Sequence, residues 1–205
     1  GFGSLMGKLP ESWTTTKISE VLEILDNGKL LQQGWSPRCI PHPSLSDDDW
    51  GVLKTTAIQA GKFVPEQNKQ LPENLTPRPQ IEVKAGDILM TCAGPRNRCG
   101  VPCFVNNTPK KLMMSGKMYR FRGVATFMNN KYIMFFLLSH DAQRAIDEIK
   151  TGINDSGLNL THDRFKQLEF SLPPSNLQTR IVAKIEHLFS ELDKGVENLK
   201  IAKSQ

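Results

Sequence analysis

The segment SNLQTRIVAKIEHLFSELDKGVENLKIAKSQ, residues 175–205, predicts one long helix. It contains no proline and a single glycine, Gly195. Its apolar side chains recur at steps of four and three residues, which is the spacing of one helical face and forms a heptad-like seam. The seam residues are Ile181, Ile185, Leu188, Leu192, Val196 and Leu199. We therefore expect a coiled-coil-type helix that follows Pro173-Pro174, with Ser175 as its N-cap.

This helix is expected to need a partner. The 29 residues from Leu177 to Gln205 span roughly 43 Å at a rise of 1.5 Å per residue, whereas a body of some 165 residues is about 32 Å across. We therefore expect the seam to pair with another long helix, either the second helix of a complete subunit or a second copy of this chain. The alternative is that the seam folds back onto the chain's own body.

The chain before this helix is predicted to be mainly β with short helices. β-branched and alternating residues predict strands at 50–58, 80–89, 101–105, 117–121 and 168–172. Helical spacing predicts helices at 18–25, 132–137 and 140–150, with Asn129-Asn130 as the cap of the second, and Thr161 is expected to cap a further helical turn through Phe165. Residues 29–49 form a long loop, residues 65–79 a proline-rich separator, and Met113, Met114, Met118 and Phe121 part of the core. The expected class is α+β: a β-rich globular domain over residues 9–174, then the long helix over residues 175–205.

The composition indicates a cytoplasmic protein. The longest apolar run, residues 132–138, is far shorter than the roughly 18 residues of a membrane span, and no signal peptide opens the chain. Residues 1–8 are expected to be a cloning remnant around an initiator Met6. The four cysteines are expected to be free thiols, and their spacing, Cys-x6-Cys-x3-Cys over Cys92, Cys99 and Cys103, is a poor zinc pattern. No metal site is expected.

Positive charge is concentrated in one stretch. Residues 78–122 hold nine basic residues and two acidic ones, so the net charge of this stretch is +7. The rest of the chain has a net charge of −2, which gives the total of +5. Such an excess suits contact with phosphates, whose neutralisation releases condensed counterions. The alternative is a solvated basic face with no partner.

Several segments resemble the specificity subunits of type I restriction-modification systems. The opening Leu9-Pro10-Glu11-Ser12-Trp13 is similar to the start of a target-recognition domain, and residues 52–58 (VLKTTAI) are similar to its next strand. Gly86-Asp87-Ile88-Leu89, followed by Gly94 and Gly100, is similar to a strand-loop-strand element of the family. The most specific match is the run of residues 151–153 (TGI), 159–161 (NLT), 172–174 (LPP) and 180–182 (RIV). The family has Glu-Gln shortly after the proline pair, whereas this chain has Leu177-Gln178.

The resemblance implies a non-catalytic subunit that reads one half of a bipartite DNA target in the major groove. It also implies docking to methyltransferase subunits and, through them, to a restriction and translocase subunit, so that S-adenosylmethionine and ATP bind those partners and this chain holds no cofactor. Family members carry two recognition domains and two long helices, so this chain corresponds to one half of a complete subunit.

Two loops are candidate base readers. In residues 91–100 (TCAGPRNRCG), Arg96 and Arg98 suit guanine and Asn97 suits adenine. Phosphate contact alone is an equal alternative for the arginines and the favoured one for Lys110 and Lys111. The second loop offers Lys29, Gln32, Gln33 and Arg38, with Trp35 expected simply to pack. Lys54 and Thr55, on the strand similar to the family's, are further candidate DNA contacts.

No catalytic motif is evident in the chain. No Gly-Lys pair completes a phosphate-binding loop, and residues 172–175 (LPPS) lack the asparagine and the aromatic residue of an adenine methyltransferase motif. Two other hypotheses stay open. One is a stand-alone DNA-binding or nuclease protein with an unrecognised site, which activity of the pure chain with magnesium would reveal. The other is a helical scaffold with an incidental basic patch, which would not bind duplex DNA in a salt-dependent way.

Overall fold

The centre of the fold is a four-stranded antiparallel sheet in the computed structural model, which describes residues 12–205. Its strands, in order, are β2 (Gln32–Gln33), β11 (Met118–Phe121), β7 (Ile88–Thr91) and β9 (Pro102–Phe104). Successive side chains of a strand point to opposite faces. Ile88 and Met90 accordingly enter one hydrophobic core, whereas Leu89 enters a second. The sheet is therefore the common wall of two cores.

The second core is completed by a three-stranded sheet. Its order is β10 (Leu112–Met113), β3 (Gly51–Leu53) and β6 (Asn68–Gln70), with β10 parallel and β6 antiparallel to β3. The hairpin of β4 (Ile58–Gln59) and β5 (Lys62–Phe63) packs against β9 and adds Ile58 to this core. Met113, Met114 and Met118 are fully buried in this core, and Phe121 is fully buried in the first, as predicted.

Three short helices cover the first core. In α1 (Asn130–Leu138) the Asn129 side chain accepts hydrogen bonds from the amides of Lys131 and Tyr132. Ser139 caps α2 (His140–Ile149) in the same way, and Thr161 caps α3 (His162–Lys166). The predicted caps Asn129 and Thr161 are confirmed, because an oxygen side chain satisfies amides that the first turn leaves free.

Two strand pairs join distant parts of the chain. β1 (Thr14–Lys17) pairs antiparallel with β13 (Glu169–Leu172) next to the base of the long helix. β8 (Ala93–Gly94) pairs with β12 (Leu158–Asn159), so the loop predicted to read DNA is held against residues some 60 positions later. The predicted strands at 101–105, 117–121 and 168–172 correspond to β9, β11 and β13.

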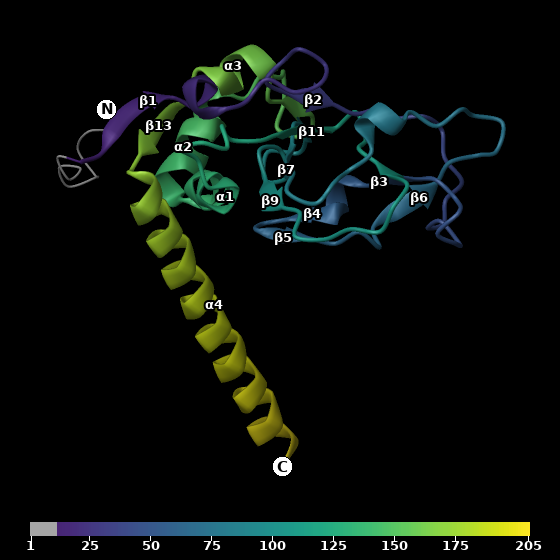
Figure 1. Cartoon of the computed structure of the whole chain (residues 1–205). Coiled ribbons are helices and arrows are strands. Elements are labelled where there is room, and N and C mark those ends of the chain that lie inside the picture. Colours follow the sequence, from purple (N-terminus) through teal and green to yellow (C-terminus); the bar gives the residue numbers. More distant parts are fainter. Residues whose placement is uncertain (1–11) are drawn as a thin grey trace.

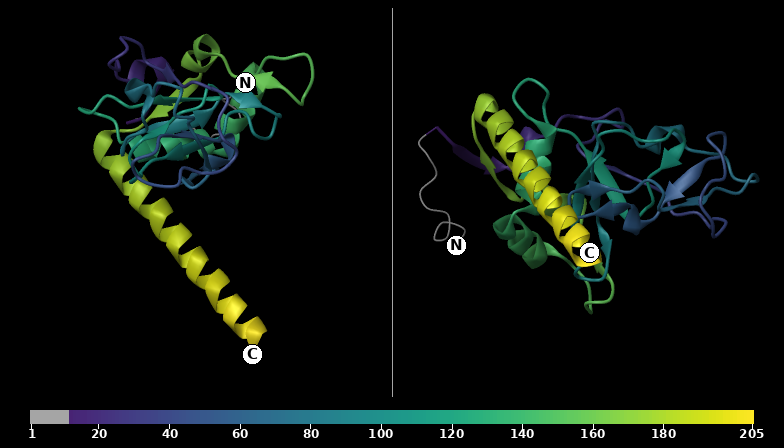
Figure 2. Two further views of the ribbon diagram at one scale, coloured as in Figure 1. Left: turned by 90° about the vertical axis from the view of Figure 1, so that its right-hand side faces the viewer. Right: turned by 90° about the horizontal axis from the view of Figure 1, so that it is seen from below.

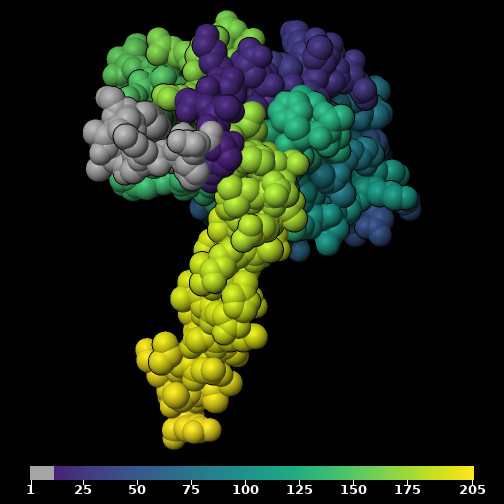
Figure 3. Space-filling view, turned by 60° about the vertical axis from the view of Figure 1, so that its left-hand side comes forward, coloured from purple at the N-terminus to yellow at the C-terminus, as the bar shows by residue number. Residues whose placement is uncertain are grey.

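The predicted long helix is present as α4 (Ser175–Ser204), 30 residues long. Figure 1 shows it leaving the body beside β13, and the left view of Figure 2 shows most of its length clear of the body. In the space-filling view only its first turns lie against other residues (Figure 3). The α+β class and the long C-terminal helix are therefore confirmed. Residues 1–8, the expected remnant, and Leu9-Pro10-Glu11 lie outside the described residues.

The predicted N-cap of α4 was wrong. Pro174 occupies the cap position and Ser175 is the first helical residue, without a side-chain capping bond. The carbonyl of Pro174 already accepts hydrogen bonds from the amides of Leu177 and Gln178. The helix thus begins one residue earlier than predicted, at Ser175. The fixed φ of proline suits the entry to a helix, and its missing N–H costs nothing there.

The helix predicted at residues 18–25 was also wrong. Only Ile18–Val21 is helical, as one 3-10 turn. Leu22 then bridges to Gly123, and the Glu23 amide donates to the carbonyl of Arg122. Pairing with the end of β11 thus replaces the second helical turn. The predicted turn at Gly28 is present, with φ of 75°, a conformation that favours glycine.

The strands predicted at 50–58 and 80–89 are shorter than expected because 3-10 turns interrupt them. One turn, Thr55–Ala57, separates β3 from β4, and another, Pro79–Ile81, precedes β7. The separator at 65–79 contains β6, and the loop at 29–49 contains β2. All four cysteines are free thiols in the structure. Within residues 12–205, no helix combines the length and apolar character that crossing a membrane requires.

Candidate nucleic-acid interface

Arg96 is engaged by acidic side chains of its own chain. Its guanidinium contacts Asp155 at 3.1 Å and Asp147 of α2 at 3.0 Å, and these contacts raise the pKa of Arg96. Lys150, whose side chain is almost fully buried, bonds the Arg96 carbonyl at 2.7 Å and also contacts Asp147. This group fixes residues 95–97 on α2, and it is close to neutral because two acids balance two bases.

Arg98 is engaged by backbone carbonyls. Its Nη2 donates to the carbonyl oxygens of Thr55 at 2.8 Å and Ile58 at 2.7 Å. The structure therefore brings the predicted residues Lys54 and Thr55 next to the predicted reading loop. Asn97, between the two engaged arginines, is exposed, as is Lys54. Base reading by residues 96–98 remains a prediction.

Of the two predicted phosphate contacts Lys110 and Lys111, Lys111 is bonded to other segments of the chain. The Nζ of Lys111 donates to the Asp48 carbonyl at 3.1 Å and approaches the Asp48 carboxylate at 3.9 Å, while its amide donates to Glu82 at 2.9 Å. Lys110 and Arg38 are exposed. Trp35 packs beneath Arg78, whose guanidinium carbon lies 3.8 Å from the ring centroid.

The second predicted loop meets two other segments at Gln33. The side-chain amide of Gln33 donates from Nε2 to the Gly116 carbonyl at 2.6 Å, and its Oε1 lies 2.8 Å from the Nε2 of His162 in α3. The turn at Gly116-Lys117 also contacts the first candidate reading loop, residues 91–100, because the Lys117 carbonyl accepts a hydrogen bond from the amide of Cys92. The two candidate reading loops therefore converge at Gly116-Lys117.

This convergence defines a basic and polar surface that we name the Gln33 patch. It consists of Lys29, Gln33, Lys117, His162 and Lys166. Burial lowers the pKa of His162, and the nearby charges of Lys166 and Lys29 lower it further. Within residues 12–205, neither Lys29 nor Lys117 forms an ion pair, and Lys166 pairs only with the highly exposed Asp163. The patch therefore has positive charge available to an anionic partner.

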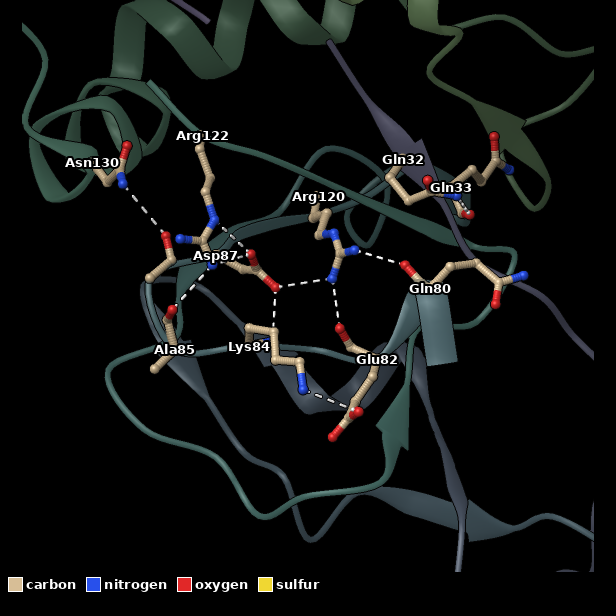
Figure 4. Close-up of polar contacts among 11 residues, drawn as sticks. Gln32, Gln33, Gln80, Glu82, Lys84, Ala85, Asp87, Arg120, Arg122 and Asn130 are labelled. Atoms are coloured by element: carbon tan, nitrogen blue, oxygen red, sulfur yellow. Dashed lines mark hydrogen bonds and ion pairs between the residues drawn. The ribbon is translucent and has the colours of Figure 1, made fainter. Parts of the chain in front are cut away.

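Sequence reasoning missed an ion cluster around Asp87. This carboxylate is 2% exposed and accepts hydrogen bonds from Arg122 at 2.7 and 2.9 Å, from Arg120 at 3.3 Å and from the Lys84 amide at 2.8 Å (Figure 4). Arg120 also donates to the carbonyls of Glu82 and Gln80. The signal was present in the sequence, since Arg120 lies on the predicted strand and Arg122 directly follows its last residue, and side chains two residues apart in extended chain point to the same face.

This cluster changes the meaning of the basic stretch. Arg120 and Arg122, like Arg96, are balanced by acids of the same chain. They hold the start of β7 to the end of β11, beside Gln32 and Gln80 (Figure 4). Part of the +7 charge of residues 78–122 is thus structural. The charge free to meet a partner is smaller than the sequence predicts.

The predicted seam on α4 has two parts. Ile181 packs against the first core of its own body, and Ile185 is half-buried. The remaining seam residues are 44 to 64% exposed: Leu188, Leu192, Val196 and Leu199. The seam is therefore free to meet a partner only beyond the third turn, from Leu188 onward. Within residues 12–205, no group of three or more His, Cys, Asp or Glu side chains is arranged to hold a metal ion.

Comparisons with known proteins agree with this architecture. Residues 10–201 match the family model of the type I restriction modification DNA specificity domain. The chain is 38% identical over 195 residues to the type I restriction enzyme EcoEI specificity subunit of Escherichia coli, covering 95% of this chain and 32% of that protein. Among solved structures, it is similar to the HsdS subunit from Thermoanaerobacter tengcongensis, with a TM-score of 0.61 and 15% identity over 94% of this chain and 41% of that one. A chain of another type I R-M system gives a TM-score of 0.64 and 14% identity over 93% and 42%. This chain spans less than half the length of each of these relatives.

Proposed function

Because the chain belongs to the family of type I restriction modification DNA specificity domains, we propose that it is a non-catalytic DNA-recognition unit that reads one half of a bipartite target. The body is the reading part and α4 is the part that connects it to partners. Since the chain corresponds to about a third of the E. coli relative, the second half of the target is read by a second unit.

The observation that carries this proposal is the Gln33 patch. Lys29 and Lys117 supply charge for phosphates, since no acid of residues 12–205 forms an ion pair with either of them. Phosphate contacts fix the register of a protein on DNA, and loops next to them then reach base edges. Both candidate reading loops adjoin the patch at Gly116-Lys117. Within these loops, the exposed Asn97 and the half-exposed Gln32, whose Nε2 donates to the Gln33 carbonyl, are the amides that we assign to adenine.

The exposed seam of α4 supports the assignment of partners. Each exposed seam residue is large and apolar and has more than two-fifths of its surface exposed. Such a continuous apolar helix face marks a surface that another helix covers. We assign this surface to the long helix of the second recognition unit, or of a second copy, and the outer side of that helix pair to the methyltransferase subunit. In this proposal S-adenosylmethionine and ATP bind the methyltransferase and translocase subunits, and this chain contributes only recognition of the DNA sequence.

Duplex binding at several salt concentrations tests the proposal. The logarithm of the binding constant for DNA is expected to fall linearly with the logarithm of salt concentration, and Lys29→Ala and Lys117→Ala are each expected to reduce the magnitude of this slope by about 0.9. Lys200→Ala, which removes another exposed lysine, on the far part of α4, is the matched control. Binding that is unaffected by both patch substitutions would refute the patch as the DNA surface. Methyl transfer by the chain without any partner would refute the non-catalytic assignment.

A further inference from the structure

Gln178 is a fully buried amide at the base of α4. It is 0% exposed, and together with Val182 it is one of two buried residues in a helix of 30. A buried amide is costly unless its polar atoms are paired. Here they are: Oε1 accepts from the Asn129 amide at 2.8 Å, and Nε2 donates to the carbonyls of Phe127 and Pro173 at 3.0 Å each. We name this group the Gln178 anchor.

The chemistry of the anchor requires glutamine. The position needs one acceptor and two donors, which the glutamine amide supplies. A glutamate carboxylate accepts but cannot donate, and leucine does neither. The anchor also connects two helices, because Asn129 is the N-cap of α1 and Pro174, beside Pro173, is the cap residue of α4. It therefore determines how the start of α4 sits on the start of α1.

Three further residues on the same side of α4 continue its packing on the body. Val182 is 6% exposed, Glu186 forms an ion pair with Lys131 at 3.0 Å, and the ring of Phe189 lies 6.1 Å from that of Phe135. With Gln178 these residues are four, four and three positions apart, which places them on one face. Both partners, Lys131 and Phe135, belong to α1. Beyond Phe189, every residue of α4 is exposed.

A small change at this base is amplified at the helix end. The length from Gln178 to Ser204 is roughly 39 Å at 1.5 Å per residue, so a rotation of about 10° displaces the end by about 7 Å. Base pairs are about 3.4 Å apart along the DNA axis. A rotation of this size therefore corresponds to about two base pairs of spacing between two recognition units joined through their helices.

We propose that Gln178 is a positioning residue that fixes the angle at which α4 leaves the body and thereby the length of unread DNA that the assembly accepts between two half-sites. The first part concerns this chain alone. The second part rests on the proposed function.

Distance measurement by electron spin resonance tests the first part on the full chain. Spin labels are placed at Lys69→Cys on the body and Lys200→Cys near the end of α4, in a Cys39→Ser background, because Cys39 is the one native cysteine that is not buried. Gln178→Leu is expected to broaden or shift the distance distribution by about 5 Å or more. Asn198→Leu, a substitution on the exposed part of the same helix, is expected to leave it unchanged.

A folded Gln178→Leu chain with the parent's distance distribution would overturn the proposal. If that variant does not fold, the Lys131–Glu186 contact replaces it as the test of the same interface. Lys131→Glu is expected to broaden the distribution, and addition of Glu186→Lys is expected to restore it. Failure of the single charge reversal to change the distribution would then overturn the proposal.

Methylation of a DNA library with varied spacers, by the chain assembled with its methyltransferase, tests the second part. The parent is expected to accept one spacer length and Gln178→Leu to accept lengths one or two base pairs away. A changed distance distribution with an unchanged spacer preference would refute the role in spacing. A parent assembly that methylates no specific target would instead refute the proposed function, while the distance measurement would still decide the role of Gln178 in the helix angle.

Discussion

Arg98 donates a hydrogen bond of 2.8 Å to the carbonyl oxygen of Thr55, and these two residues were both predicted from the sequence to contact DNA. Nη2 of the same guanidinium also reaches the carbonyl of Ile58 at 2.7 Å. One arginine thus closes the 3-10 turn between β3 and β4 against the loop that follows β7. The position of this loop therefore depends on Arg98, whether or not the side chain meets DNA.

Arg98→Ala is expected to lower the free energy of unfolding by about 2 kcal/mol, because two hydrogen bonds from a charged donor are lost and two carbonyls lose their partner. Urea denaturation measures the loss. Arg98→Lys is the matched control: it keeps the charge but not the planar geometry, and it is expected to recover only part of the stability. Full stability of the alanine variant would show that these contacts do not hold the loop.

Asp87→Asn is expected to lower the free energy of unfolding by roughly 3 kcal/mol, since it removes the charge that Arg120 and Arg122 share at a site 2% exposed. The loss should appear as a lower denaturation midpoint with an unchanged slope. Asp26→Asn removes an equal charge from an exposed position and is expected to have little effect. Equal midpoints for the two variants would contradict a structural role for Asp87.

Local sequence features predicted the parts of this fold that depend on local physics. The apolar spacing in residues 175–205 predicted α4, and the oxygen side chains of Asn129 and Thr161 predicted two helix starts. Sequence alone did not predict which arginines are neutralised, because Arg96 and Asp155 are 59 positions apart. It likewise could not show that Gln33 and His162, 129 positions apart, would meet. Charge counting overestimated the free positive charge for that reason.

Stability is expected to fall as the pH drops from 7.5 to 5, in part through His162. Burial, then Lys166 and Lys29, hold the pKa of this histidine below its ordinary value of 6.5. The unfolded chain therefore binds the proton more readily than the folded chain. The contribution of His162 is present in full above pH 6.5 and is lost as the pH falls through the lower pKa of the folded state. His162→Asn is expected to flatten this part of the stability curve, and a variant with the parent's slope would contradict it.

Replacement of Leu188 and Leu192 by aspartate is expected to leave the body intact and to abolish helix pairing. Both side chains are more than half exposed in the isolated chain, so the substitutions should cost no more than about 1 kcal/mol of stability, mainly through the lower helix propensity of aspartate. In a paired seam they would instead place two charges between apolar surfaces, which is strongly unfavourable. Light scattering measures the mass of the free chain, and co-purification with the methyltransferase measures assembly.

The matched control for this seam is the pair Ala183→Asp and Ser190→Asp, which adds the same charge to exposed positions of α4 on the side away from the seam. This control should pair like the parent, and any loss of its assembly with the methyltransferase would report on the outer side of the helix, to which that docking is assigned. A parent that is strictly monomeric would exclude self-pairing and leave a second recognition unit as the partner of the seam. A seam variant that still assembles with the methyltransferase and a second unit would exclude the seam altogether, because the exposed row from Leu188 to Leu199 would then have no part in either contact.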